Sequence, residues 1–183
     1  MQPLVGPGGF AALALAVATA AAAVDYKTGH IPNWLTIGAL SLGSALHLLR
    51  GAWLAGVGGL KEAAITVAFG VALCSVVPLV LRFVARMGGG DLKLLAALGA
   101  ICGPMTGFRA QTYAFIAMFV YVLGRLAYEG KLFQMGFRLL ALIAWRTRKQ
   151  RAPLAPELMS PLRFGPAILV GVCVAVFADS GIG

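Results

Sequence analysis

Long uncharged stretches alternate with short polar connections along the whole chain. The first stretch is rich in alanine and ends at Asp25, and similar apolar stretches recur as far as residue 178. A helix needs about 20 predominantly apolar residues to cross a bilayer. The pattern predicts an all-α fold, a polytopic membrane helix bundle in a single membrane-embedded domain. About six transmembrane helices are expected, at residues 10–24, 34–49, 63–81, 92–102, 112–126 and 164–178.

Glycine and proline mark the expected ends of these segments. Residues 51–59 are rich in glycine, so we expect a loop there between the second and third spans. Gly103-Pro104 is expected to end the fourth span, which is short enough to be tilted or to stop beneath the membrane surface. Pro32 fixes its own φ angle, and Asn33 is the expected N-cap of the second span.

Residues 131–151 differ from a simple span because apolar and basic residues are interspersed. This composition predicts an interfacial helix that lies against anionic lipid headgroups. A seventh span is the alternative. The basic residues of the segment are Lys131, Arg138, Arg146, Arg148, Lys149 and Arg151.

Composition excludes an ordinary soluble domain. Hydrophobic residues make up 60% of the 183 residues and charged residues only 11%, where about a quarter is usual. The three cysteines lack C-x-x-C spacing, so we expect packed thiols and neither a zinc site nor a disulfide framework. No Lys or Arg precedes Lys27, so a retained first span is expected instead of a cleaved signal peptide.

The formal net charge of +9 is distributed unevenly over the predicted connections. The first, third and fifth connections carry twelve of the fifteen Lys and Arg residues, which the positive-inside rule places in the cytoplasm. Both termini are then outside, and no nucleic-acid partner is expected. Asp25 lies where the first span ends and Asp91 where the fourth begins, so both face the cytoplasmic leaflet.

Asp25 and Asp91 are the candidate chemical groups, because an ionisable residue at membrane depth is a functional hypothesis by default. Two neighbouring carboxyl groups share a proton, and this state suits hydrolysis of an amide: one group accepts a proton from water while the other polarises the carbonyl. The only histidines are His30 and His47, which is too few for a zinc site and gives no placed triad histidine. No metal or cofactor is therefore expected.

Other roles for these aspartates stay open at this point. Asp91 could pair with Lys93 or Arg86, and Asp25 with Lys27. Residue types and spacing alone leave a protease and an ion- or proton-coupled carrier about level, and a non-enzymatic pilus or secretion assembly factor is a third reading. The remaining acidic residues are expected to be solvated loop charges: Glu62, Glu129 and Asp179.

Three motifs in order resemble a known group of membrane proteases. Gly88-x-Gly90-Asp91 resembles the G-x-G-D signature of intramembrane-type aspartyl proteases, which include presenilin and signal peptide peptidase. The surrounding sequence is similar to that of the type IV prepilin peptidases over residues 10–178. The similar segments are Asp25 with Ile31-Pro32-Asn33, the stretch 88–99, and Phe164-Gly165-Pro166-Ala167 followed by Gly171.

This resemblance implies an aspartyl endopeptidase of the bacterial inner membrane, with Asp25 and Asp91 as the catalytic pair. Its substrate would be a prepilin-like helix with an extended cationic N-terminus, and the enzyme would cleave the basic leader at the cytoplasmic face. Larger members carry an insert with two C-x-x-C pairs and also methylate the new N-terminus. This chain lacks the insert and is similar to the short, peptidase-only form of tight-adherence (Flp) pilus systems, so methyltransferase activity is not implied.

Supporting roles follow from the positions of the neighbouring residues. Gly88, Gly89 and Gly90 are expected to let the substrate backbone reach Asp91, either by close approach or through a positive φ. Pro32 and Asn33 are expected to set the turn that aims Asp25. Lys93 either tunes Asp91 or faces lipid headgroups.

Overall fold

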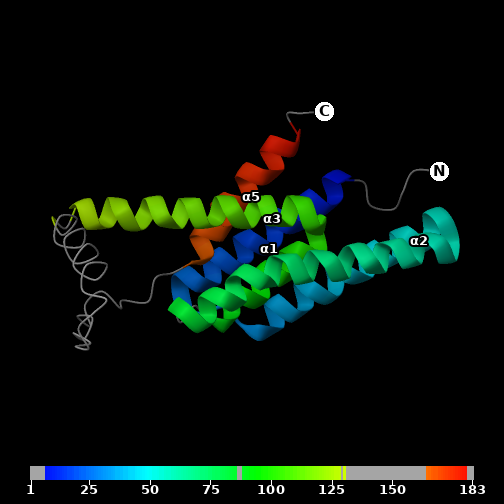
Figure 1. Ribbon diagram of the computed structural model, residues 1–183, viewed down its shortest axis with the longest axis horizontal. Coiled ribbons are helices and arrows are strands. Elements are labelled where there is room, and N and C mark those ends of the chain that lie inside the picture. Colours follow the sequence, from blue (N-terminus) through cyan, green and yellow to red (C-terminus); the bar gives the residue numbers. More distant parts are fainter. Residues whose placement is uncertain (1–6, 86–87, 129, 131–163, 181–183) are drawn as a thin grey trace, which may run out of the picture.

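The computed structural model describes residues 7–85, 88–128, 130 and 164–180, and this part of the chain is helical without any strand (Figure 1). The prediction of an all-α fold is therefore confirmed for these residues. The predicted interfacial helix at 131–151, and the alternative of a seventh span, lie outside the described residues. The helices are α1 (Pro7–Thr28), α2 (Asn33–Ala85), α3 (Gly89–Tyr128) and α5 (Gly165–Ser180).

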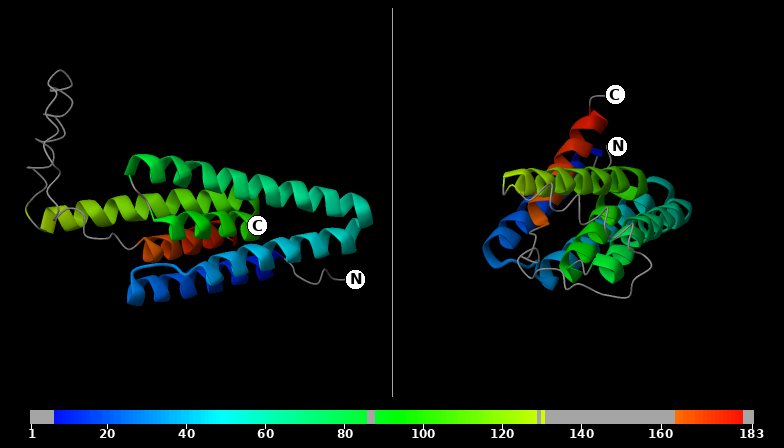
Figure 2. Two further views of the ribbon diagram at one scale, coloured as in Figure 1. Left: turned by 90° about the horizontal axis from the view of Figure 1, so that it is seen from below. Right: turned by 60° about the vertical axis from the view of Figure 1, so that its left-hand side comes forward.

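Helix α2 folds back on itself to form a long antiparallel pair of arms (Figure 2). The break is confined to Ala55 (φ −140°, ψ 22°) and Gly56 (φ 58°, ψ −136°). Gly51 and Gly59 lie against each other's backbone across the two arms, where a Cβ on either would collide. The nine-residue loop predicted at 51–59 is wrong in extent, because glycine here serves close helix packing as well as the turn.

Helix α3 is broken where the sequence predicted it. Gly103 has a left-handed φ of 78°, and Pro104 follows it. A short arm, residues 89–102, precedes this break, and a longer arm follows it to Tyr128 (Figure 1). The two breaks turn α2 and α3 into four arms, so each of the six predicted spans overlaps a helical segment. Whether these segments cross a membrane stays a prediction.

The short first arm of α3 lies at the centre of the core. Leu94, Leu98 and Ile101 on this arm are completely or almost completely buried. Small residues allow the neighbouring helices to approach closely: Gly70 of α2 lies against Gly99 of α3. The remaining core side chains come from α1 (Ala14, Ala18, Ala21) and from α5 (Ile168, Val172, Ala175).

The outer surface is rich in exposed apolar side chains. Stretches of α1 (Gly8–Thr28) and α2 (Asn33–Phe83) are long and apolar enough to cross a bilayer, and α5 contributes a shorter apolar stretch, Gly165–Asp179. A soluble monomer rarely exposes apolar surface on this scale, whereas lipid accommodates it. Examples of exposed large side chains are Trp34, Leu54, Phe69, Phe83 and Phe119.

Candidate active site

Asp25 lies near the C-terminal end of α1, in a helix end of defined geometry. Gly29 has a left-handed φ of 72°, and its N–H donates to the carbonyl oxygen of Asp25 at 2.8 Å. This arrangement is a common way to satisfy the last carbonyls of a helix. The side chain of Asp25 is only 4% exposed. The end of α1 therefore holds a carboxylate inside the bundle, where an unpaired charge would be costly.

The N-terminus of α5 supplies the partner of that carboxylate. The N–H of Gly165 donates to Oδ2 of Asp25 at 2.9 Å. The first amides of a helix lack partners within the helix, and their partial positive charge favours an anion. A Cβ on Gly165 would lie 2.7 Å from Oδ2 and 2.8 Å from Cβ of Asp25. Glycine is thus required for the backbone of α5 to reach this carboxylate.

Asp91 lies in the first turn of α3, beside the glycine motif. A Cβ on Gly88 would lie 2.9 Å from Oδ2 of Asp91, and one on Gly90 would lie 3.0 Å from the carbonyl oxygen of Ile31. None of the three motif glycines is among those with a positive φ. Two uses of these glycines were expected, close approach of neighbouring atoms and a positive φ. The structure shows the first and not the second.

The two aspartates interact electrostatically. Asp91 precedes the apolar segment 92–102, and its pKa is raised from 3.8 to about 7, first by burial and second by the negative charge of Asp25. A raised pKa favours the protonated form of Asp91 at neutral pH. The pair is therefore asymmetric: Asp25 accepts a hydrogen bond from a helix N-terminus, whereas Asp91 is the member that favours a proton.

The expected N-cap at Asn33 is wrong. The carbonyl oxygen of Pro32 accepts the first bonds of α2, from the N–H groups of Leu35 (3.2 Å) and Thr36 (3.4 Å). Oδ1 of Asn33 instead accepts a hydrogen bond from Nζ of Lys93 at 2.8 Å. An asparagine oxygen can serve either purpose, and here the long-range partner takes it. Lys93 thus joins the first turn of α3 to the first turn of α2.

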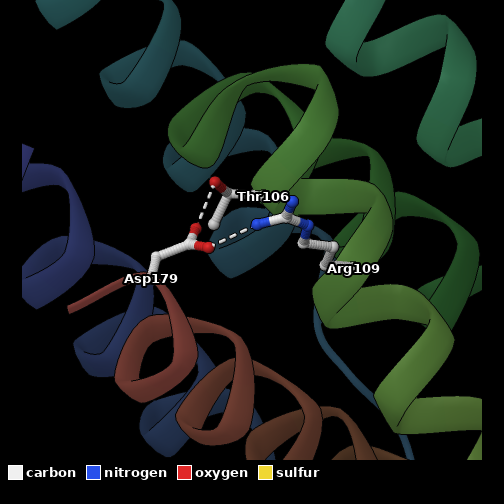
Figure 3. Close-up of polar contacts among 3 residues, drawn as sticks. All are labelled: Thr106, Arg109 and Asp179. Carbon is white, nitrogen blue, oxygen red and sulfur yellow. Dashed lines mark hydrogen bonds and ion pairs between the residues drawn. The ribbon is translucent and has the colours of Figure 1, made fainter. Parts of the chain in front are cut away.

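Asp179 is not the solvated loop charge that the sequence predicted. It lies in the last turn of α5, where Oδ1 pairs with Nη1 of Arg109 at 2.6 Å and Oδ2 accepts from the hydroxyl of Thr106 at 2.7 Å (Figure 3). Both partners belong to α3. Helix α5 is therefore attached at both ends, to Asp25 through Gly165 and to α3 through Asp179.

Gly165 is the residue of this site that the sequence did not single out as functional. It was noted only as part of a similar motif, because a backbone N–H leaves no side-chain signature. A glycine at the first position of a helix that starts in an apolar core was the available signal.

As to metals, no group of three His, Cys, Asp or Glu side chains gathers in the described ranges.

Comparison with known families gives the class of the protein. Residues 12–123, more than half of the chain, match the type IV leader peptidase family, and they include Asp25 and Asp91. The chain belongs to the type IV leader peptidase family. It is thus a peptidase that hydrolyses peptide bonds and takes prepilin-type substrates, and its apolar helices agree with a membrane protein. Comparisons with curated proteins and with solved structures found no match.

Proposed function

We propose that Asp25 and Asp91 are the catalytic pair of this leader peptidase. The observation that carries the proposal is their electrostatic interaction in unequal surroundings: the charge of Asp25 contributes to the raised pKa of Asp91, while Asp25 accepts a hydrogen bond from the N–H of Gly165. Two coupled carboxyl groups with different proton affinities are the arrangement that acid–base hydrolysis needs.

The surroundings support a different role for each carboxyl group. Asp25, ionised, accepts a proton from a water molecule as the water oxygen attacks the scissile carbonyl carbon. Asp91, protonated, donates to the carbonyl oxygen, so a tetrahedral diol forms without a free oxyanion. The proton on Asp25 then passes to the leaving nitrogen as the C–N bond breaks, and Asp91 recovers its proton from the diol. The pair returns to its starting state.

The surrounding loops position this pair. Gly88 is exposed beside Asp91, which supports access by an extended substrate, and Gly90 allows Ile31 to pack closely against the first turn of α3. Pro32 accepts the first bonds of α2, and the bond from Lys93 to Asn33 ties the start of α2 to the start of α3. We assign Pro32, Asn33 and Lys93 to loop geometry, and the chemistry to the aspartates.

The same proposal includes a topology and a substrate. Six spans within residues 10–178 would form one membrane-embedded domain of the bacterial inner membrane. Both aspartates would face the cytoplasm, where the basic leader of a prepilin-like substrate stays by the positive-inside rule. Residues 1–183 contain no C-x-x-C pair, which supports a peptidase of the Flp type that does not methylate its product.

Leader removal in cells tests the proposal. The chain is co-expressed with a short Flp-type prepilin, and the wild type is compared with Asp25→Asn and Asp91→Asn by the gel mobility of the pilin. Equal accumulation of the three enzymes in the membrane is the control. Shortening by the wild type and by neither variant is expected. Cleavage by either variant would show that the catalytic pair is wrong.

Conservative variants separate this proposal from an ion carrier. A cation or proton carrier would keep part of its transport with Asp25→Glu or Asp91→Glu and would show ion flux in liposomes. A peptidase that depends on the distance between two carboxyl groups would lose cleavage with either change and show no flux. An assembly factor would tolerate alanine at both positions.

A further inference from the structure

A groove opens on the outer side of the bundle between the returning arm of α2 and the second arm of α3. Its volume is about 400 Å³. Phe119 and Ile116 on its rim are 65% and 54% exposed, so the groove faces the surroundings of the bundle, which in a membrane are lipid. Its lining is almost entirely apolar and consists of Val77, Phe108, Gln111, Thr112, Phe115, Ile116 and Phe119.

Gln111 is the exception in this lining. Its side chain is 1% exposed, and Oε1 has no hydrogen-bond partner among the described residues. The neighbouring hydroxyl of Thr112 donates instead to the carbonyl oxygen of Phe108 at 2.9 Å. A buried acceptor without a donor is destabilising. A lipid acyl chain has no donor to offer, so Gln111 favours an occupant that carries a polar hydrogen on an apolar surface.

One aromatic contact connects the lining of the groove to the candidate active site. The ring of Phe115 packs against the ring of Phe164, with 5.3 Å between centroids. Phe164 directly precedes Gly165, whose N–H holds Asp25. A ligand in the groove would therefore contact Phe115, whose ring packs against the residue that precedes Gly165.

We propose that this groove binds the apolar helix of the prepilin-type substrate, the part that follows the leader. A hydroxyl or amide side chain on that helix donates to Oε1 of Gln111, and the phenylalanine rim packs against its apolar face. The inference rests on the proposed function, because the substrate is the prepilin-type helix. It adds a docking surface outside the catalytic pair, and it makes Gln111 a residue for substrate recognition.

Site-specific photo-crosslinking locates the substrate helix. A photoreactive phenylalanine analogue replaces Phe119 in the full-length chain in membranes, in the Asp91→Asn background so that uncleaved substrate persists. Phe69 is the matched control, since it is an aromatic residue of similar exposure (59%) that does not line the groove. The expected result is a covalent adduct with the substrate from position 119 and none from position 69. Adducts with lipid alone, or with a second copy of the chain, would overturn the inference.

Kinetics with Gln111→Leu provide the second readout. We expect KM for a substrate with its apolar helix to rise by about three- to tenfold, with kcat unchanged because the contact is the same in the ground state and the transition state. A substrate truncated shortly after the cut should be processed as by the wild type. The free variant should be at least as thermostable as the wild type, since an unpaired acceptor is removed. An equal effect on both substrates, or a loss of thermostability, would contradict the docking role.

The two proposals fail in different ways. If the wild type removes the leader but neither the crosslink nor the change in KM is seen, the groove inference is wrong and the catalytic pair stands. If the wild type removes no leader and position 119 gives no substrate adduct, both are wrong.

Discussion

Replacing Gly165 with alanine tests the contact on which the asymmetry of the aspartate pair depends. The new Cβ would lie 2.7 Å from Oδ2, 2.8 Å from Cβ and 3.1 Å from Cγ of Asp25. Cβ of Asp25 is fixed to the backbone of α1, so rotation of the carboxylate cannot relieve the whole collision. Helix α5 must therefore move away from α1, and the hydrogen bond from Gly165 is lost.

The size of the effect follows from the kind of bond that is lost. A hydrogen bond to a charged group contributes about 1.5–3 kcal/mol, and a barrier higher by about 1.4 kcal/mol slows a reaction tenfold. We therefore expect kcat to fall by about 10- to 100-fold. The apparent pKa of the rate profile should also shift, because a displaced Asp25 changes the negative charge that helps to raise the pKa of Asp91. A defect in folding alone would lower the amount of active enzyme without moving the profile.

The assay is leader removal by purified enzyme in lipid, with Gly38→Ala as the matched control. Gly38 is also helical, and a Cβ there would meet nothing within 4 Å. Gly38→Ala should keep wild-type kcat and the wild-type pH profile. The reasoning would be refuted if Gly165→Ala also kept both, because the 2.9 Å bond would then have no part in the chemistry.

Three further results are expected. Activity should decline as pH rises through about 7, because Asp91 then loses the proton it donates; a rate profile checks this, and unchanged activity at pH 9 would contradict it. Asp91 also makes the free energy of unfolding depend on pH. Its pKa is higher in the folded state than in the unfolded state, so the free energy of unfolding is highest below pH 3.8 and falls as pH rises to about 7. The loss is at most about 4 kcal/mol. Asp91→Asn should therefore raise the thermal unfolding midpoint in detergent at pH 8 and leave it nearly unchanged at pH 4, whereas an equal shift at both would exclude ionisation as the cause. Arg109→Gln should cost about 1 kcal/mol or less, because its pair with Asp179 is partly exposed; calorimetry checks this, and a loss of several kcal/mol would show that the pair is not solvent-screened.

The helical part of the fold was readable because membrane helices follow a simple physical rule. Backbone polar groups in lipid must be paired within the segment, so long apolar stretches predict helices directly. Gly103-Pro104 predicted its break correctly, since a left-handed glycine followed by proline cannot continue a helix. The loop predicted at 51–59 was wrong in extent, because glycine also serves close packing. Only Ala55 and Gly56 leave the helix.

The candidate site was predictable in part. Asp25 and Asp91 stood out because charges are rare in this chain, and the distribution of basic residues predicts that both face the same side of the membrane. Gly165 and Gln111 did not stand out, since one acts through its backbone and the other is an uncharged residue in an apolar stretch. Asn33 could cap its own helix or bind across to Lys93, and only the three-dimensional distance between the two helix starts decides which.

A double-variant cycle on the aspartates tests the central claim most directly. The quantity is kcat/KM for leader removal by the wild type, Asp25→Asn, Asp91→Asn and the double variant, each purified in lipid at a pH below 7. If the two carboxyl groups act as one unit, each single variant should lose about 10²- to 10⁴-fold or more, and the double variant should lose no more than the worse single one. Multiplicative losses, or a single variant within tenfold of the wild type, would contradict the shared-proton pair.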